Sequence, residues 1–150
     1  MKPRINFARA FPKVVKAMSS LKANADACGL DHSLLELVKL RISQINGCAY
    51  CIDMHTKDAR ALGETERRID SLPAWRETPF FTERERAALA FTESVTLLAD
   101  DHVPTEAYQA VAAHFDPDEV AALVGLIVTI NAWNAIAVST RAWPPGSYQP

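Results

Sequence analysis

Two cysteines and a histidine lie close together in the sequence and could carry out redox chemistry. Cys48 and Cys51 are three residues apart, and His55 follows four residues after Cys51. In a helix, residues three or four apart share a face, so the two thiols and the imidazole would lie together. A thiolate attacks peroxides and disulfides, and a neighbouring imidazole can move the protons of such a reaction. The spacing therefore predicts a small thiol-based site.

The thiols would lie at the start of a helix and on its inner face. Cys48 directly follows Gly47, so it would occupy the first turn, where free N–H groups and the helix dipole favour negative charge. A helical projection of residues 48–62 groups the site residues and several apolar residues in one arc. The arc contains Cys48, Cys51, Ile52, His55, Ala59 and Leu62. Tyr50 falls on the opposite side in this projection.

The residue pattern also leaves other roles open. Buried cysteines can be small apolar core residues, and a buried histidine can be a core residue with satisfied hydrogen bonds. Cys48, Cys51 and His55 could be three zinc ligands, but a structural zinc site needs a fourth, and the sequence has no second Cys-x-x-Cys or His-x-x-x-His pair. A thioredoxin-like site would need a preceding strand, which the pattern does not predict.

Length and composition indicate a globular protein. The 150 residues are 49% hydrophobic and 23% charged, with a formal net charge of −2, so nucleic-acid or membrane binding is not expected. Residues 1–7 hold no apolar stretch of signal-peptide length, and we expect a cytoplasmic protein. The apolar stretch Val120–Val138 is interrupted by Thr129, Asn131 and Asn134, which predicts a core helix rather than a membrane span.

Helical periodicity and helix punctuation run along the whole chain, whereas strand-like alternation is hard to find. We predict an all-α fold, a single-domain bundle of six or seven helices that comprises residues 1–150. The expected helices are 11–28, 32–46, 48–62, a short one at 65–72, 82–98, 104–114 and 117–141. The Asn46-Gly47 pair should form a turn that folds the helix 32–46 back onto the cysteine helix.

The cysteine motif belongs to a longer pattern, Glu36-x11-Cys48-x2-Cys51-x3-His55, within the segment Leu40–Thr56. This pattern closely resembles the core of the alkylhydroperoxidase D (AhpD)-like family, in the carboxymuconolactone decarboxylase superfamily. The likeness extends to Glu93 and to the segment Asn131-Ala132-Trp133-Asn134, so it covers most of residues 31–141. The combined pattern is specific, whereas a Cys-x-x-Cys pair alone would not be.

The resemblance implies a thiol peroxidase that assembles into dimers, trimers or hexamers and uses no metal, flavin or other cofactor. Cys51 resembles the thiol that attacks the peroxide, and Cys48 resembles its resolving partner. Glu36 and His55 resemble the proton-relay groups of the family. The substrate would be a hydroperoxide, and the reductant an external dithiol, which is a lipoyl protein in the best-studied members. Those members have a histidine where this chain has Tyr50.

Two alternative functions follow from the same residues. The chain could be a thiol-disulfide redox sensor or exchange module with little peroxide turnover. It could also be a non-redox, carboxymuconolactone decarboxylase-like enzyme in which the thiols are incidental. The position of Glu36 is also open, because its side of the helix lies opposite the apolar arc of Leu34, Val38 and Ile45. That pattern alone favours an exposed glutamate, whereas the resemblance implies a buried proton relay.

Overall fold

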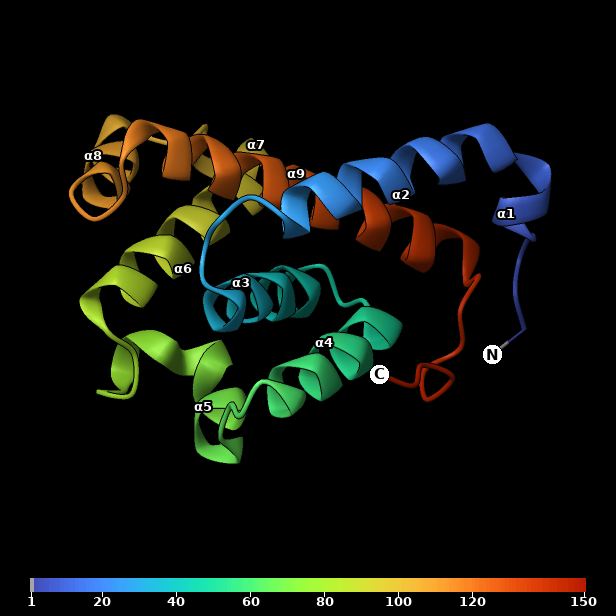
Figure 1. The fold of residues 1–150 in the computed structure, drawn as a ribbon, viewed down its shortest axis with the longest axis horizontal. Coiled ribbons are helices and arrows are strands. Elements are labelled where there is room, and N and C mark those ends of the chain that lie inside the picture. Colours follow the sequence, from blue (N-terminus) through green and yellow to red (C-terminus); the bar gives the residue numbers. More distant parts are fainter. Residues whose placement is uncertain (1) are drawn as a thin grey trace.

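The computed structural model describes residues 2–150, and this part of the chain is helical and contains no strand (Figure 1). It forms nine α-helices and one 3-10 helix, η1. Their bounds are α1 Phe7–Ala10, α2 Pro12–Asp26, α3 His32–Ile45, α4 Ala49–Ala61, α5 Glu66–Ser71, η1 Leu72–Glu77, α6 Glu83–Thr96, α7 Leu98–Asp101, α8 Thr105–Ala112 and α9 Pro117–Thr140. The predicted all-α class is confirmed.

The predicted number of helices is lower than the observed number because three short segments are also helical. The seven expected helices correspond to α2, α3, α4, α5, α6, α8 and α9, with ends that differ by a few residues. Helices α1 and α7 have four residues each, which is too short to produce a periodic pattern. The element η1 has Pro73 in its first turn and follows α5 directly. Proline is favoured at a helix start, so the chain forms a 3-10 helix here instead of a loop.

Helix α3 is the centre of the fold and is enclosed by α4, α6 and α9 (Figure 1). All residues from Leu34 to Leu40 are buried, including the charged residues Glu36 and Lys39. A helix covered on every side has no solvent face, so the amphipathic pattern does not decide where its polar residues lie. The expectation of an exposed Glu36 is therefore wrong. The observed burial of Glu36 agrees with the position that the resemblance implies.

Helix α9 is long and apolar, and it packs against α2, α3 and α6. Asp116 and Glu119 form a capping box at its start, with Pro117 in the first turn. By length and composition α9 alone among the described helices could cross a membrane, but 44% of its most apolar window is buried inside the fold. Its packing is that of the core helix predicted from the sequence.

Two segments of irregular structure hold α4 in place. The Asn46-Gly47 turn reverses the chain as predicted, and Gly47 has a φ of 64°, which favours glycine. The carboxy-terminal tail then runs back across the outer side of α4 (Figure 1). Lys57 donates to the carbonyl of Tyr148 at 2.9 Å, and the Tyr148 hydroxyl donates to Asp58 at 2.8 Å. Helix α4 is thus fixed between α3 and the tail.

Candidate functional site

The two cysteines lie at the start of α4, as the sequence predicts, and their sulfur atoms form a disulfide. Cys48 is the N-cap residue of α4, and its Sγ accepts the backbone N–H of Cys51 at 3.3 Å. Both cysteines are buried. An N–H group directed at a sulfur stabilises negative charge on it, so the start of α4 favours a thiolate at Cys48 when the pair is reduced.

Glu36 and His55 meet beside the thiols and form a buried pair between α3 and α4. The distance from His55 Nδ1 to Glu36 Oε2 is 2.9 Å, and the two residues are 2% and 8% exposed, respectively. The hydrogen bond fixes the orientation of the imidazole, which leaves Nε2 for proton exchange. The structure therefore brings together all four predicted site residues: Cys48, Cys51, His55 and Glu36. Their catalytic roles stay predictions.

Sequence reasoning missed three charged residues that continue this network. Lys39 is 4% exposed, and its Nζ donates to Glu36 Oε1 at 2.8 Å. The same Nζ lies 2.6 Å from Asp26 Oδ1 at the end of α2, and Asp26 also pairs with Lys22. A line of alternating charges thus runs from the half-exposed Lys22 to the buried His55. The sequence contains a signal for Lys39, because it follows Glu36 by three residues and the other residues of the stretch Leu34–Leu40 are apolar.

This network holds Glu36 in its charged form. Burial alone would raise the pKa of Glu36, but the hydrogen bond from His55 and the charge of Lys39 outweigh burial and lower the pKa below its usual 4.5. Burial would likewise lower the pKa of Lys39, yet Glu36 and Asp26 raise it above its usual 10.5. The carboxylate and the ammonium group therefore stabilise each other inside the protein.

The lowered pKa of Glu36 predicts that acid weakens the fold. A carboxyl group whose pKa is lower in the folded state contributes its full stability above the unfolded value of about 4.5, and this contribution is lost as the pH falls through the folded value. We expect Glu36→Gln to reduce the loss of unfolding free energy between pH 5 and pH 3, measured by urea denaturation. Glu106→Gln, on the exposed side of α8, is the matched control. An equal dependence of the unfolding free energy on pH in the wild type and in Glu36→Gln would contradict the prediction.

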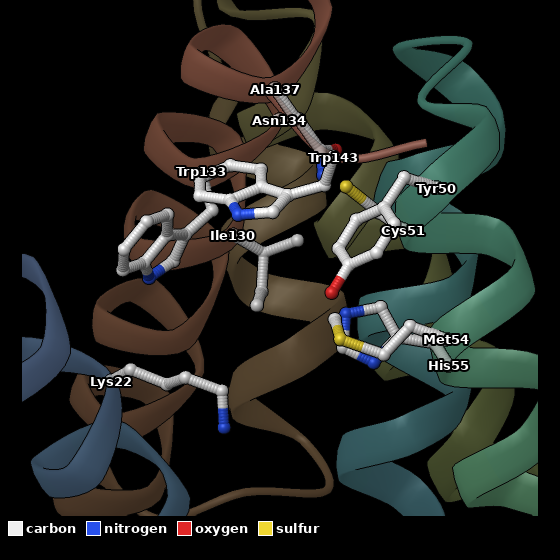
Figure 2. A pocket seen from close by; sticks show the side chains of 10 residues that line it. All are labelled: Lys22, Tyr50, Cys51, Met54, His55, Ile130, Trp133, Asn134, Ala137 and Trp143. Carbon is white, nitrogen blue, oxygen red and sulfur yellow. The ribbon is translucent and has the colours of Figure 1, made fainter. Parts of the chain in front are cut away.

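A pocket of about 160 Å³ opens beside Cys51 and His55 (Figure 2). Its other lining residues are Lys22, Tyr50, Met54, Ile130, Trp133, Asn134, Ala137 and Trp143. The ring centroids of Trp133 and Trp143 are 5.8 Å apart, and those of Tyr50 and Trp143 are also 5.8 Å apart. An apolar cavity of similar size, about 150 Å³, is known to hold benzene. The pocket therefore fits a small apolar or aromatic group next to the sulfur.

The position of Tyr50 differs from the helical projection, which placed it away from Cys51 and His55. Tyr50 is half-buried and lines the pocket together with both residues (Figure 2). The reason is Trp143, which follows α9 and packs on the Tyr50 ring, so a second side of α4 is also covered. Leu62 also differs from the projection, because it lies at the end of α4 and is exposed.

The remaining polar residues of the predicted pattern have structural contacts. The Asn46 side chain donates to Asn131 Oδ1 at 2.7 Å and to Asn134 Oδ1 at 3.1 Å, which ties the turn before α4 to α9. Asn134 in turn donates to the hydroxyl of Ser43 at 3.3 Å. Glu93 does not reach the thiols. It accepts from Arg41 at 2.7 Å and from the Trp75 indole at 2.8 Å, and it joins α3, η1 and α6.

The comparison with known proteins identifies the family. The model of the carboxymuconolactone decarboxylase family matches residues 12–94, which is more than half of the chain and includes the four site residues. The chain belongs to this family. The resemblance inferred from the sequence motif is thus confirmed at the level of the family.

Two relatives of this family member match it over nearly its whole length. The uncharacterised protein YdfG of Bacillus subtilis (strain 168) is 41% identical over 139 residues, which are 93% of this chain and 95% of YdfG. A crystal structure from Agrobacterium tumefaciens, of unknown function and described as a candidate antioxidant defence protein AhpD, is 42% identical with a TM-score of 0.92. The match covers 96% of this chain and 99% of that one.

A more distant structure shows that the same fold occurs with another reaction. The debrominase Bmp8, solved in complex with 2,3,4-tribromopyrrole as a cysteine-to-alanine variant, is 19% identical to this chain with a TM-score of 0.80. The match covers 90% of this chain and 72% of Bmp8. The fold of this carboxymuconolactone decarboxylase family member therefore does not by itself select a reaction, and the chemistry has to be argued from the site.

One further group of side chains in this family member has the composition of a metal site. Ligand atoms of Glu36, His55 and Asp58 lie within 4.8 Å of one another. Each of the three already has a partner, because Glu36 binds Lys39 and His55, and Asp58 accepts from Tyr148. The ammonium group of Lys39 next to Glu36 also opposes a second cation. The residues fit a hydrogen-bonded network better than a metal ion.

Proposed function

We propose that this family member is a thiol-dependent alkyl hydroperoxide reductase in antioxidant defence. The observation that carries the proposal is the arrangement of the redox pair Cys48–Cys51 beside the buried pair Glu36–His55. Cys51 and His55 also line the same apolar pocket, so a nucleophile and a proton donor face one substrate. The description of the Agrobacterium tumefaciens relative as a candidate antioxidant defence protein supports this proposal.

The proposed reaction uses only these groups and an external dithiol. The Cys51 thiolate attacks one oxygen of ROOH, an S–O bond forms, the O–O bond breaks, and His55 supplies the proton that converts the alkoxide into ROH. Cys51 is then a sulfenic acid. The Cys48 thiolate attacks its sulfur, which forms the disulfide and releases water after protonation. A dithiol returns two electrons and two protons to the cysteine pair.

The pocket predicts a preference for organic hydroperoxides over hydrogen peroxide. Burial of a phenyl-sized group contributes about 1.5–3 kcal/mol, so we expect cumene hydroperoxide to react at least about tenfold faster than hydrogen peroxide with the reduced protein. The reaction should consume two thiols per chain and yield the Cys48–Cys51 disulfide. It is measured by stopped-flow mixing followed by thiol titration and peptide mass analysis.

Two variants test whether the preference comes from the pocket or from a general effect on the protein. Trp133→Ala removes one aromatic side of the pocket and should reduce the difference between the rate constants for the two peroxides. Tyr108→Ala removes an aromatic side chain that is 49% exposed on α8, and it should leave the difference unchanged. A reversible disulfide without peroxide consumption would favour the sensor or exchange module over the peroxidase.

The setting of the proposed enzyme stays a prediction. A cysteine pair that must be reduced in every cycle requires a reducing compartment, which agrees with the expected cytoplasmic location. The reductant is expected to be an external dithiol, with a lipoyl protein as one source. Assembly with copies of the same chain is also expected, and three exposed valines on α9 (Val124, Val128 and Val138) offer an apolar face for it.

A further inference from the structure

We propose that a second pocket, beside Cys48, is the entrance for the reductant and that it selects a small dithiol carrying a carboxylate. This inference rests on the proposed function only in assuming that the cysteine pair cycles. The second pocket has a volume of about 280 Å³. It is lined by Arg4, Gly47, Cys48, Ala49, Tyr50, Ala137, Val138, Arg141, Trp143, Pro144 and Pro145.

The two cysteines of the disulfide line two different pockets. Cys51 lines the aromatic pocket, and Cys48 lines the second pocket. Tyr50, Ala137 and Trp143 line both pockets and form the wall between them. A peroxide beside Cys51 and a thiol beside Cys48 would therefore approach from opposite sides of this wall. Oxidant and reductant need not compete for one entrance.

The second pocket has more unpaired positive charge than the first. Arg4 and Arg141 line it and no carboxylate does, whereas the lysine that lines the first pocket, Lys22, pairs with Asp26. Arg4 is held in place because its backbone N–H donates to the carbonyl of Thr140 at 2.8 Å and its guanidinium donates to the carbonyl of Ser139 at 3.0 Å. Within residues 2–150, neither arginine forms an ion pair with an acidic side chain.

The surroundings of the second pocket strengthen its positive potential. Six lysine and arginine residues, and no aspartate or glutamate, precede Asp26 in the sequence. Helix α2 of this basic segment packs along α9, whose end carries Arg141 (Figure 1). Within residues 2–150, five of these six cations form no ion pair, and Lys22 pairs with Asp26. Unpaired cations around a concave site concentrate anionic ligands and raise their association rate. The rest of the chain is acidic overall, because the formal net charge of the whole chain is −2 although this segment is positively charged.

Attack at Cys48 would release Cys51 next to a proton donor. A thiolate of the reductant attacks Cys48 Sγ, a mixed disulfide forms, the Cys48–Cys51 bond breaks, and Cys51 leaves as a thiolate beside His55, which can donate a proton to it. The second thiol of the reductant then attacks the reductant sulfur that is bonded to Cys48, and this step releases the Cys48 thiolate. The dithiol becomes a cyclic disulfide, and the protein gains two electrons and two protons.

The test compares dihydrolipoate with dihydrolipoamide, which present the same dithiol and differ in a carboxylate and a neutral amide. The oxidised protein is mixed with each dithiol, and the rate constant of disulfide reduction is followed by the fluorescence of the tryptophans. We expect dihydrolipoate to react about three to ten times faster at low ionic strength, because exposed ion pairs with one or two arginines give a modest gain. The ratio should fall towards one in high salt.

Three variants make the test specific to the second pocket. Arg4→Gln/Arg141→Gln should bring the ratio close to one, and Arg141→Glu should invert it. Lys13→Gln removes an exposed cation of the same basic segment that does not line the pocket, and it should keep the ratio. Equal rates in the wild type, a faster reaction with the amide, or a ratio that survives the double substitution would overturn the proposal.

The assay is independent of peroxide and therefore separates this proposal from the proposed function. A protein that prefers dihydrolipoate but consumes no hydroperoxide would support the reductant pocket and contradict the peroxidase. A protein that reduces hydroperoxides without any preference between the two dithiols would support the peroxidase and contradict the reductant pocket. A preference for the amide would point to a lipoyl group in amide linkage to a carrier protein as the reductant.

Discussion

Cys51→Ser is expected to abolish hydroperoxide reduction, with a fall of at least about 10³-fold in the rate constant of the prereduced protein. The serine hydroxyl is not ionised at neutral pH, so the pocket would hold a much weaker nucleophile in the same position. Stopped-flow consumption of cumene hydroperoxide measures the effect. Cys28→Ser is the matched control, because Cys28 is a free cysteine that packs against the core formed by α3, α6 and α9.

Cys48→Ser should separate the two halves of the reaction. The first oxidation would still occur at Cys51, but no disulfide could form, so a sulfenic acid should accumulate and be trapped by dimedone. The structure makes an exchange of roles a real alternative, since Cys48 is the N-cap and accepts the N–H of Cys51. If Cys51→Ser reacts with peroxide and Cys48→Ser does not, the two cysteines have the opposite roles.

A double variant and the two single variants also test the other functions. If a double cysteine-to-alanine variant keeps activity on a carboxylated lactone, the protein is a non-redox, decarboxylase-like enzyme and its thiols are incidental. If each single variant retains full peroxide turnover, the redox pair is not the reactive centre. Both outcomes are distinct from that of a redox sensor, which forms the disulfide in the wild type but does not turn over.

Local sequence signals predicted the helices because each signal acts within a few residues. The Asn46-Gly47 pair forms the expected turn, and capping boxes from Thr82 to Glu85 and from Asp116 to Glu119 begin α6 and α9 where the ranges 82–98 and 117–141 were expected. They also predicted that α3 and α4 fold back on each other, which brings Glu36 to the thiols. The grouping of the four site residues could therefore be predicted from the sequence motif and one turn.

The parts that could not be predicted depend on segments that are distant in sequence. Tyr50 lines the pocket because Trp143 returns from the tail after α9, and a projection of α4 alone contains no information about that segment. Glu36 is buried because α3 is enclosed on all sides, which an amphipathic pattern cannot represent. The ion pair between Lys39 and Asp26 joins α3 to α2, so the spacing within α3 reveals Lys39 but not its second partner.

Lys39→Met is expected to lower the free energy of unfolding by about 3–5 kcal/mol, because removing one member of a buried charge network leaves the others uncompensated. The side chain of Lys39 is 5% exposed, and it contacts both Glu36 and Asp26. Methionine has a similar length, so the loss reports the charge rather than a cavity. Urea denaturation at neutral pH measures the change.

Lys22→Met is the matched control, because Lys22 pairs with the same Asp26 but its side chain is 42% exposed. This surface pair should contribute less than about 1 kcal/mol. The effect of Lys39→Met should shrink in a Glu36→Gln background, since the buried carboxylate that needs the ammonium group is then absent. Similar losses for both lysine variants would contradict the network, because burial of Lys39 is the physical reason for the difference. An undiminished loss in the Glu36→Gln background would instead place the role of Lys39 at Asp26, in fastening α2 to α3.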